Sequence, residues 1–322
     1  MKFLVTGGGG FIGWRVVRNI LARGIPAVVA DWSVDPRLRQ RLERESGPLV
    51  SFVPCDVAEY SDVARCFRLE PDITHAIHLA YLMSAEVEAN PHLGARVNVL
   101  GMVNLFEAAL NHRLERLVFT SSETVYGASQ GVYGERPVKE SDYCAPADHF
   151  FTYGVMKILN EFMAEKYVQK HGISMACARP PVVFGHGRKR GAVLWAEQFI
   201  SLPAIGQPVS LPFSAQNRDC WLYVDDCAEQ LVRLALKPRL AHFAYNSSGH
   251  SIRAGDLANV VRRWVPGAEI TFDESQPATP LVDDLDGGRM IEEIGFTPRP
   301  IEDGVLAHLN EARAEASLPP LG

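Results

Sequence analysis

Residues 3–17, FLVTGGGGFIGWRVV, place four consecutive glycines between a short apolar run and an amphipathic one. Glycine lets a backbone turn tightly and lets another group approach it closely. A buried strand that passes through such a turn into a helix is typical of the first unit of a nucleotide-binding α/β domain. The stretch therefore constrains the fold more than any other feature of the chain.

Short runs rich in β-branched residues alternate with longer amphipathic segments. The runs predict buried strands at residues 2–6, 26–31, 49–54, 75–80, 116–122 and 174–179. The amphipathic segments predict helices near 11–23, 60–69, 94–112 and 153–171, followed by a helix at 223–236 and a strand at 242–248. This alternation predicts an α/β fold, a Rossmann-type, doubly wound parallel sheet with helices on both faces.

The glycine run fits two versions of the dinucleotide-binding motif, GxxGxxG through Gly7, Gly10 and Gly13, or GxGxxG starting at Gly8. Such a turn brings bare backbone to a pyrophosphate, at which the next helix points its free N–H groups. Asp31 closes the next strand 18 residues after Gly13, where a carboxylate accepts hydrogen bonds from the adenosine ribose. That carboxylate would repel a 2′-phosphate, and no arginine follows it directly. The sequence therefore predicts NAD as the cofactor.

The composition of the chain changes after Arg179, where proline, glycine and charged residues become frequent. Periodicity is poor up to about residue 219, and the part after 247 reads as rich in loops. We expect residues 1–178, together with about 220–246, to form an NAD-binding Rossmann domain. Residues 179–219 and 247–322 are expected to form a smaller C-terminal α/β domain that binds the substrate.

Composition excludes several other classes of protein. The 322 residues carry a net charge of −6, which argues against a nucleic-acid binder that relies on positive charge. The six cysteines have no CxxC spacing and predict reduced thiols, and the scattered histidines have no zinc-ligand spacing, so no metal is expected. The N-terminus does not resemble a signal peptide, and no apolar run approaches the roughly 20 residues of a membrane span. We expect a cytoplasmic protein that binds neither nucleic acid nor membranes.

Tyr153 and Lys157 lie four residues apart and so share one face of a predicted helix. A lysine ammonium and an oxidised nicotinamide near the phenol would lower its pKa from about 10 toward neutral. Ser121 and Ser122 follow a predicted strand, where open α/β sheets bind their ligands. A hydroxyl there can hydrogen-bond the reacting oxygen while the tyrosine moves the proton. The plain alternatives are a packed tyrosine beside a solvated lysine, and a serine that caps the next turn.

Seven short segments, TGGGGFIG, CDV, HLA, NVLG, SSETVYG, YGVMK and RDCWLYVDD, occur together in this order. Their order and spacing resemble the extended short-chain dehydrogenase/reductase family, the NAD-dependent epimerase/dehydratase group, over at least residues 1–230. The resemblance implies that Ser122, Tyr153 and Lys157 are catalytic, with Tyr153 as the base and Lys157 orienting the nicotinamide ribose. It also implies a homodimer formed through the helices at 94–112 and 153–171.

The resemblance implies further binding residues for both the cofactor and a small-molecule substrate. The cofactor-binding residues would be Gly7, Gly10, Phe11, Ile12, Gly13, Asp31, Asp56, Val57, Leu79, Ala80, Asn98, Tyr153, Lys157 and Pro180. The substrate-binding residues would be Ser122, Glu123, Tyr153, Val182, Arg190 and Arg218. Arg218 matches an arginine that grips the substrate diphosphate in nucleotide-sugar members. Arg190 belongs to the basic run HGRKRG, in which Arg188, Lys189 or Arg190 could hold an anionic group or lie in solvent.

The chain departs from the nucleotide-sugar pattern in three places. Epimerases typically carry a segment like RYFNVYG, whereas this chain has RPPVVFG, which puts Val182 at the asparagine position. The lysine or arginine that often follows an HLA-type segment is replaced by residues 81–83, YLM. Only one acid, Glu123, follows the predicted catalytic serine, whereas dehydratases usually carry two, so dehydration is disfavoured.

These observations predict an enzyme that transfers a hydride at a secondary hydroxyl carbon of a sugar or sugar nucleotide, as an epimerase with a transient keto intermediate. The alternative is an NAD-dependent dehydrogenase or reductase of a non-nucleotide hydroxy compound, with net redox. Val182 and Met83 favour the alternative, and Arg218 favours the epimerase. A third possibility is a non-catalytic protein that senses NAD(H), but such proteins usually lose the tyrosine or the lysine, and both are present here.

Overall fold

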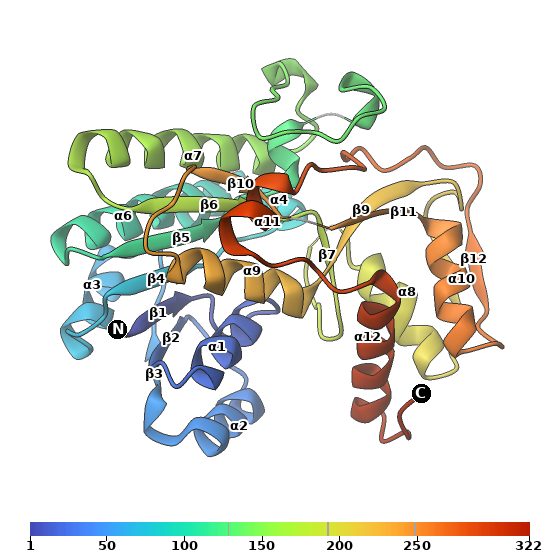
Figure 1. Cartoon of the computed structure of the whole chain (residues 1–322), viewed down its shortest axis with the longest axis horizontal. Helices are drawn as coiled ribbons and strands as arrows, with labels where there is room; N and C mark the ends of the chain where they lie inside the picture. Colours follow the sequence, from blue (N-terminus) through green and yellow to red (C-terminus); the bar gives the residue numbers. More distant parts are fainter. Residues whose placement is uncertain (128, 192, 248) are drawn as a thin grey trace.

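The computed structural model describes residues 1–127, 129–191, 193–247 and 249–322. Its centre is a sheet of seven parallel strands in the order β10-β6-β5-β4-β1-β2-β3 (Figure 1). The strands are β1 (Phe3–Thr6), β2 (Ala27–Asp31), β3 (Val50–Pro54), β4 (His75–His78), β5 (Arg116–Thr120), β6 (Met175–Arg179) and β10 (Ala244–Asn246). The order reverses direction between β1 and β4, so the predicted doubly wound, Rossmann-type sheet is confirmed.

Helices cover both faces of this sheet. They are α1 (Gly13–Ala22), α2 (Pro36–Ser46), α3 (Tyr60–Leu69), α4 (Ser84–Ala89), α5 (Pro91–Gly94), α6 (Gly101–Asn111), α7 (Thr152–His171) and α9 (Val224–Leu236). The helices α1 and α9 lie on one face of the sheet, and α3, α6 and α7 lie on the other (Figure 1). Their buried side chains belong to two separate cores, one on each face. The first helix starts at Gly13 rather than at residue 11, because the glycine turn continues through Ile12.

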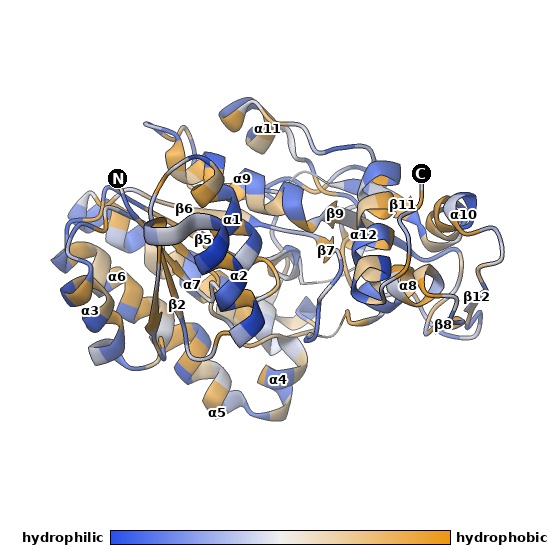
Figure 2. Cartoon of the chain, turned by 90° about the horizontal axis from the view of Figure 1, so that it is seen from below, coloured by the Kyte–Doolittle hydropathy of each residue, from blue (hydrophilic) through white to orange (hydrophobic). Residues whose placement is uncertain are grey.

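The strands of the large sheet bury both of their faces. In β1, Phe3 and Val5 join the core formed with α1 and α9, whereas Leu4 joins the core formed with α3 and α6. Successive side chains of a strand point to opposite faces, so a sheet covered on both sides needs apolar residues at every position. Figure 2 shows this contrast, with hydrophobic strands inside and a largely hydrophilic α2 outside.

A smaller lobe lies beside the carboxyl ends of these strands (Figure 1). Its strands are β7 (Val182–Phe184), β9 (Arg218–Tyr223) and β11 (His250–Arg253) in one sheet, and β8 (Val209–Leu211) with β12 (Ile270–Phe272) in another. Its helices are α8 (Trp195–Ala204), α10 (Ala254–Trp264) and α12 (Ile301–Glu315). The core on the α1 and α9 face continues into this lobe through Phe199, Trp221 and Leu309. The predicted domain boundaries stay a prediction, and α11 (Gly288–Ile294) lies against α9 and β10 of the large sheet.

The expectation of a loop-rich chain after residue 247 was wrong, because α10 and α12 lie there. Each buries one apolar side, through Leu257 and Val261 in α10 and Val305 and Leu309 in α12. The helices α2 and α8 were also missed. The surface of α2 is almost wholly polar, with only Leu42 buried, whereas α8 buries residues around most of its circumference. Neither pattern has the single apolar stripe by which a helix is found in a sequence.

The joined helix Pro91–Asn111 contains α5, a π-helical turn at Ala95–Leu100 and α6. By length and composition it is apolar enough to cross a membrane, and half of its most apolar window is buried inside the protein. Five of the six cysteines are buried thiols, and Cys144 is a partly buried one whose Sγ lies 3.0 Å from His149 Nε2.

Candidate active site

A cavity of about 990 Å³ opens at the carboxyl ends of the parallel strands. Its lining runs from the glycine turn after β1 and the acid at the end of β2, past the residues that follow β4 and β5, to the start of α7 and the segment after β6. Open α/β sheets bind their ligands at this edge, where the strand order reverses. The chain therefore collects most of its predicted site residues around one space.

The glycine turn has no room for side chains. A Cβ atom on Gly13 would lie 2.0 Å from the Gly7 carbonyl oxygen, and one on Gly7 would lie 2.7 Å from the Ala80 nitrogen. Gly7 also has a φ of +69°, and the Gly10 amide donates to the Gly7 carbonyl at 3.0 Å. The GxxGxxG reading is thus the one in which all three glycines meet. The bare backbone at the start of α1 fits the pyrophosphate of NAD.

Asp31 faces the same cavity from the end of β2. Its carboxylate accepts hydrogen bonds from the Gly9 amide at 3.0 Å and the Ser33 amide at 3.3 Å. Burial raises the pKa of Asp31, and the Gly9 amide is the strongest opposing influence. The carboxylate is therefore fixed where an adenosine ribose would lie. Asp56 and Val57, the predicted neighbours of the adenine, line the same cavity.

Tyr153 and Lys157 lie on the first turns of α7. The carboxylate of Glu88 in α4 caps this helix by accepting from the Thr152 amide at 2.7 Å and the Thr152 hydroxyl at 3.1 Å. Tyr153 lines the cavity, whereas Lys157 is fully buried behind it. The Lys157 ammonium donates to the Thr120 carbonyl at the end of β5 at 2.7 Å and lies 2.9 Å from the ring centre of Tyr81.

Ser122 lines the cavity and also caps the 3₁₀ turn Glu123–Tyr126. Its Oγ accepts from the Thr124 amide at 3.1 Å, which leaves its single proton for a further acceptor. A Cβ atom on Gly154 would lie 2.4 Å from the Thr124 carbonyl oxygen. Glycine at this position therefore brings the start of α7 against the serine turn, so capping and catalysis are compatible roles for Ser122.

The expected effect of Lys157 on the pKa of Tyr153 stays a prediction, and the Lys157 Nζ lies 5.3 Å from the centre of the Tyr153 ring. Burial raises the pKa of Tyr153, and the charge that opposes this rise comes from Arg188. Burial also lowers the pKa of Lys157 itself well below its ordinary value, with Glu161 opposing. A lysine so enclosed is poorly suited to stay charged on its own. Arg188 is thus a further cation whose charge opposes the rise in the pKa of Tyr153.

Three predicted site residues lie apart from the positions expected of them. The Asn98 side chain is held by the Leu82 backbone, with contacts of 2.8 and 2.9 Å, and fixes the segment after β4 without lining the cavity. Arg190 is exposed, lies 3.8 Å from Glu86, and is close enough to Asp31 to affect its pKa. It therefore belongs to the adenosine end of the cavity rather than to the substrate end.

Arg218, the third of these residues, lines a second depression, of about 430 Å³, rather than the main cavity. The two spaces share Thr279 and Leu281 in their walls. Arg253 lies directly opposite Arg218 across the β9–β11 pair, so this depression carries two guanidinium groups. The remaining predicted residues all line the main cavity: Phe11, Ile12, Leu79, Ala80, Glu123, Pro180 and Val182.

Sequence reasoning passed over several residues that line the cavity. Tyr81, whose ring lies against the Lys157 ammonium, was counted only as a missing basic residue. Trp195 and residues 279–281 also line the cavity, from segments with no motif to mark them. Arg188 was considered only as one of three basic residues in HGRKRG. Its inward direction has no signal in the sequence, since neighbouring residues of a loop follow no fixed period.

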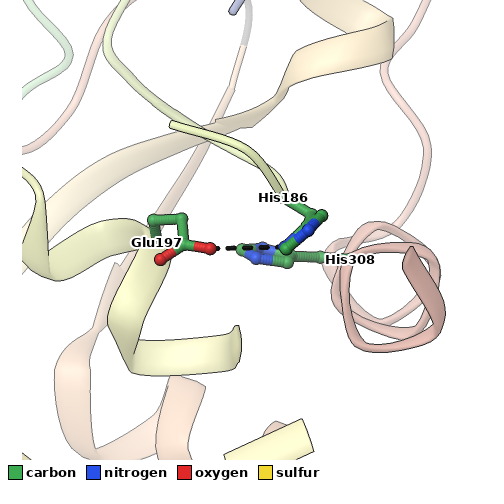
Figure 3. Close-up of side chains that lie close together, drawn as sticks. All are labelled: His186, Glu197 and His308. Atoms are coloured by element: carbon green, nitrogen blue, oxygen red, sulfur yellow. Dashed lines mark ion pairs between the residues drawn. The ribbon is translucent and has the colours of Figure 1, made fainter. Parts of the chain in front are cut away.

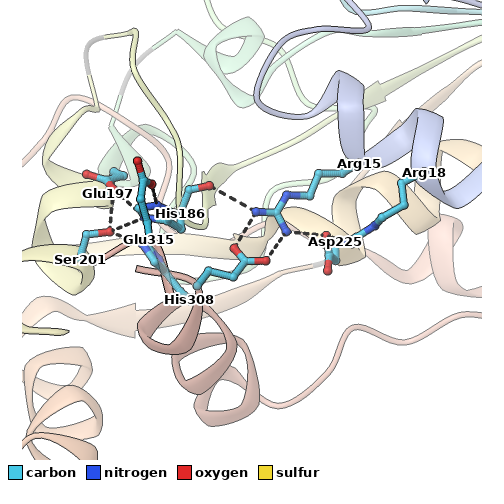
Figure 4. Close-up of polar contacts among 9 residues, drawn as sticks. Arg15, Arg18, His186, Glu197, Ser201, Asp225, His308 and Glu315 are labelled. Atoms are coloured by element: carbon cyan, nitrogen blue, oxygen red, sulfur yellow. Dashed lines mark hydrogen bonds and ion pairs between the residues drawn. The ribbon is translucent and has the colours of Figure 1, made fainter. Parts of the chain in front are cut away.

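The HGRKRG run is anchored at its first residue (Figure 4). His186 Nδ1 lies 3.1 Å from Ser201 Oγ and 3.3 Å from Glu197 Oε1, both in α8, and Nε2 contacts Glu315 at the end of α12. The Ser201 hydroxyl donates to Glu197 at 2.6 Å and lies 2.9 Å from His308 Nε2. The imidazole of His186 thereby ties the run to two helices of the smaller lobe.

His186, Glu197 and His308 have the residue types of a metal site, and their ligand atoms lie within 4.8 Å of one another (Figure 3). The Ser201 hydroxyl lies within hydrogen-bond distance of all three, in the space that a shared ion would need. Hydrogen bonds account for the arrangement, and we assign no metal to it.

Buried Arg15 joins the cofactor-binding helix α1 to the same region (Figure 4). Its guanidinium donates to Glu311 of α12 at 2.8 and 2.7 Å, to Asp225 of α9 at 2.9 Å, and to the His186 carbonyl at 3.2 Å. The glycine turn, the HGRKRG run and the C-terminal helix are thus connected through one side chain.

We expect His186→Gln to lower the melting temperature at about pH 6 and to have little effect at about pH 9. The hydrogen bond to Glu197 raises the pKa of His186 above 6.5, with burial opposing and Glu315 adding to the rise. Burial raises the pKa of Glu197, but the hydrogen bonds from His186 and Ser201 outweigh it, so the pKa falls below 4.5.

The expected pH dependence of stability follows from the directions of these two pKa shifts. A raised histidine pKa gives stability that is complete below the unfolded value and is lost as the pH rises through the folded value. A lowered carboxyl pKa gives stability that is present above its unfolded value. Calorimetry of both proteins across this pH range tests the assignment, and an equal loss at both ends would contradict it.

Comparison with known proteins places these features in context. Residues 3–246 match the NAD dependent epimerase/dehydratase family. The mitochondrial L-threonine 3-dehydrogenase of Bos taurus is 27% identical over 232 residues, which are 71% of this chain and 59% of that protein. The UDP-glucose 4-epimerase of Mycolicibacterium smegmatis is 26% identical over 72% of each chain. The solved structure of a Thermus thermophilus UDP-glucose 4-epimerase in complex with NAD is 26% identical and has a TM-score of 0.77, over 97% of this chain and 99% of that one.

Proposed function

The chain belongs to the NAD dependent epimerase/dehydratase family, and we propose that it acts at a secondary hydroxyl carbon of a sugar or sugar nucleotide. It is an NAD-dependent enzyme of the extended short-chain dehydrogenase/reductase type. The observation that carries the proposal is a single cavity with the glycine cradle at one end and Ser122 and Tyr153 at the other. When bound, NAD supplies a nicotinamide ring that takes up a hydride and can return it.

Residues around the cavity transfer the proton, hydrogen-bond the reacting oxygen and hold the nicotinamide ribose. Tyr153 takes the proton of the reacting hydroxyl, and Ser122 directs its free proton at the same oxygen. Lys157 donates to the Thr120 carbonyl, which leaves at least one further N–H for the ribose next to the nicotinamide. The positive charge of Arg188 favours the phenolate form of Tyr153.

A nucleotide-linked substrate is supported by the second depression. Arg218 and Arg253 lie there side by side, and paired guanidinium groups suit a diphosphate. The wall that this depression shares with the main cavity would let a substrate reach from the diphosphate to Tyr153. The UDP-glucose 4-epimerases among the relatives agree with this reading.

Net oxidation or reduction of a hydroxy compound is the second candidate. Val182 and residues 81–83 give the cavity apolar walls where epimerases have polar contacts to the sugar. One relative is an L-threonine 3-dehydrogenase, and threonine has a secondary hydroxyl next to the carbon that bears its carboxylate.

The nucleotide that stays bound to freshly purified protein distinguishes the two candidate functions. The protein would be denatured without added cofactor, and any released nucleotide would be identified and quantified. NAD at close to one equivalent favours an epimerase, which has no need to exchange it. A site that binds and releases NADH freely favours a dehydrogenase or reductase. Protein that binds neither form of the cofactor would contradict both.

We further propose that the protein is a homodimer formed through α7 and the helix before β5. These helices expose apolar side chains that are 37–57% accessible: Leu100, Val155, Ile158, Leu159 and Phe162. Phe162→Glu is expected to convert dimers into monomers, because a charge at a buried interface is costly. Light scattering after gel filtration measures this, with Leu69→Glu, a 60% exposed leucine on α3, as the control. Wild-type protein that is monomeric at micromolar concentration would overturn the proposal.

A further inference from the structure

We propose that Arg188 binds an anionic group of the substrate, a carboxylate carried close to the reacting carbinol carbon. The proposal rests on the proposed function, because it takes the reacting hydroxyl to lie at Tyr153. The substrate class that follows is hydroxy acids and sugar acids, either free or as the sugar portion of a nucleotide.

The protein holds the Arg188 side chain at the wall of the cavity. Nη1 donates to the Val183 carbonyl in β7 at 2.7 Å, and Nε donates to the Arg190 carbonyl at 3.4 Å. Gly191 has a φ of +105°, and a Cβ atom there would lie 3.2 Å from Arg188 Nη2. The loop is therefore shaped around the guanidinium. Within the described part of the chain, Nη2 has no hydrogen-bond acceptor.

Arg188 also has no carboxylate partner among the described residues. It keeps some solvent contact through the cavity and is otherwise enclosed by protein, so burial lowers its pKa to about 10. Two other buried arginines are paired, Arg15 with Glu311 at 2.7 Å and Arg179 with Glu161 at 2.6 Å. Buried Arg116 has no carboxylate partner among the described residues, but each of its guanidinium nitrogens donates to an oxygen of Ser174, Leu234 or Pro238, whereas Arg188 Nη2 has no such acceptor. A buried cation without a counter-ion is costly, and an anionic ligand would relieve that cost.

Glu123 is the carboxyl group that faces Arg188, and it does not take the place of such a ligand. The two groups influence each other's pKa but lie beyond ion-pair distance. Glu123 is buried, its Oε2 has no hydrogen-bond partner among the described residues, and burial raises its pKa well above the ordinary value, with Asp219 adding to the rise. Because no ion pair joins the two groups, the guanidinium of Arg188 stays available to a ligand.

The position of Arg188 favours the substrate over the cofactor as the source of the anion. Arg188 lines the same cavity as Tyr153 and donates to the Val183 carbonyl, next to Val182 in β7, and its charge opposes the rise in the pKa of Tyr153. Val182 and residues 81–83 are uncharged, and the nearby carboxylate of Glu86 accepts from the Met83 amide at 2.9 Å. The NAD pyrophosphate is the competing source, since the guanidinium lies 5.7 Å from the ring centre of Phe11 in the glycine motif.

Calorimetric titration of the NAD-saturated full-length protein tests the proposal without relying on turnover. Three matched pairs would be used: glucuronate and glucose, UDP-glucuronate and UDP-glucose, and L-threonine and its amide. Wild-type protein should bind the carboxylate member of at least one pair about 10- to 150-fold more tightly, as expected for hydrogen bonds to a charged group. The pair that responds identifies a free or a nucleotide-linked acid.

Arg188→Met should abolish this preference, and Arg188→Lys should restore part of it. Arg239→Met, which removes an exposed arginine outside the cavity, should leave it intact. The melting temperature of Arg188→Met should equal or exceed that of the wild type, because an unpaired buried cation is removed. A purely structural arginine would instead lower it.

Three results would overturn the proposal: no preference for a carboxylate in any wild-type pair, a preference that survives Arg188→Met, or a loss of NAD affinity in Arg188→Met by the same factor. The last would assign the arginine to the pyrophosphate. Turnover of neutral substrates without a carboxylate preference would leave the proposed function standing and remove Arg188 from it. A carboxylate preference without redox chemistry would keep Arg188 as the anion-binding residue and remove the proposed function.

Discussion

Replacing Tyr153 with phenylalanine is expected to lower turnover by about 10²- to 10⁴-fold, the usual contribution of general acid–base catalysis. The ring is 6% exposed and packs at the start of α7, and phenylalanine would keep that packing. Only the hydroxyl that moves the proton is lost. The affinity for NAD should stay within about twofold, because the cradle, Asp31 and Lys157 are untouched.

Tyr143→Phe provides the matched control, since Tyr143 is 87% exposed and the change removes the same hydroxyl from the surface. Steady-state kinetics and NAD titration on both variants would be compared with the wild type. Turnover of Tyr153→Phe close to the wild-type value would remove Tyr153 from the mechanism. Loss of NAD binding in the same variant would assign it a structural role instead.

Replacing Gly13 with alanine is expected to weaken NAD binding by about 100-fold, near the ~3 kcal/mol upper end of the usual cost of overpacking. The added Cβ would lie 2.0 Å from the Gly7 carbonyl oxygen and 2.8 Å from the Gly8 Cα. Both neighbours are backbone, so no side chain can rotate away. The turn that faces the pyrophosphate would have to open, which removes the close approach on which binding depends.

Gly267→Ala makes the same chemical change where a Cβ meets nothing within 4 Å, and it should leave NAD binding unchanged. Titration of both variants with NAD, together with their melting temperatures, separates a local defect from a global one. Wild-type affinity in Gly13→Ala would show that the glycine turn is not the pyrophosphate site.

The parts of the site that could be predicted from sequence are those fixed by short-range geometry. The spacing of Gly7, Gly10 and Gly13 follows from one turn, and Tyr153 and Lys157 share a helix face because they are four residues apart. Most of the parallel strands could also be predicted, since they are short runs dominated by apolar residues. These features depend on contacts within a few residues or on burial from both sides.

The features that were missed depend on packing between distant segments. The helix α12 packs on α8 and β9, and α10 packs on α12 and β11, so their places in the smaller lobe become clear only when it is assembled. Asn98 lies in a π-helical turn, and its side-chain amide hydrogen-bonds both the backbone amide and the carbonyl of Leu82. No local sequence pattern indicates these contacts. Periodicity alone cannot foresee either arrangement.

Arg188 and Arg190 illustrate the same limit within a single loop. They are two residues apart and chemically identical, yet Arg188 is largely enclosed and donates to the Val183 carbonyl, whereas Arg190 is exposed and lies 3.8 Å from Glu86. The choice is made by the Val183 carbonyl and by the left-handed backbone of Gly191. The full burial of Lys157 is a similar case, because it follows from the fold and not from its spacing to Tyr153.

The central claim is that the hydrogen on the reacting carbon leaves as a hydride within the cavity. It is tested most directly with a substrate that carries deuterium at that carbon, chosen from the pairs that bind the NAD-loaded protein. The account predicts that the deuterium is kept, either in the reduced nicotinamide ring or at the inverted carbon of the product. Deuterium that exchanges into the solvent would mean that the carbon loses a proton, and would contradict the account.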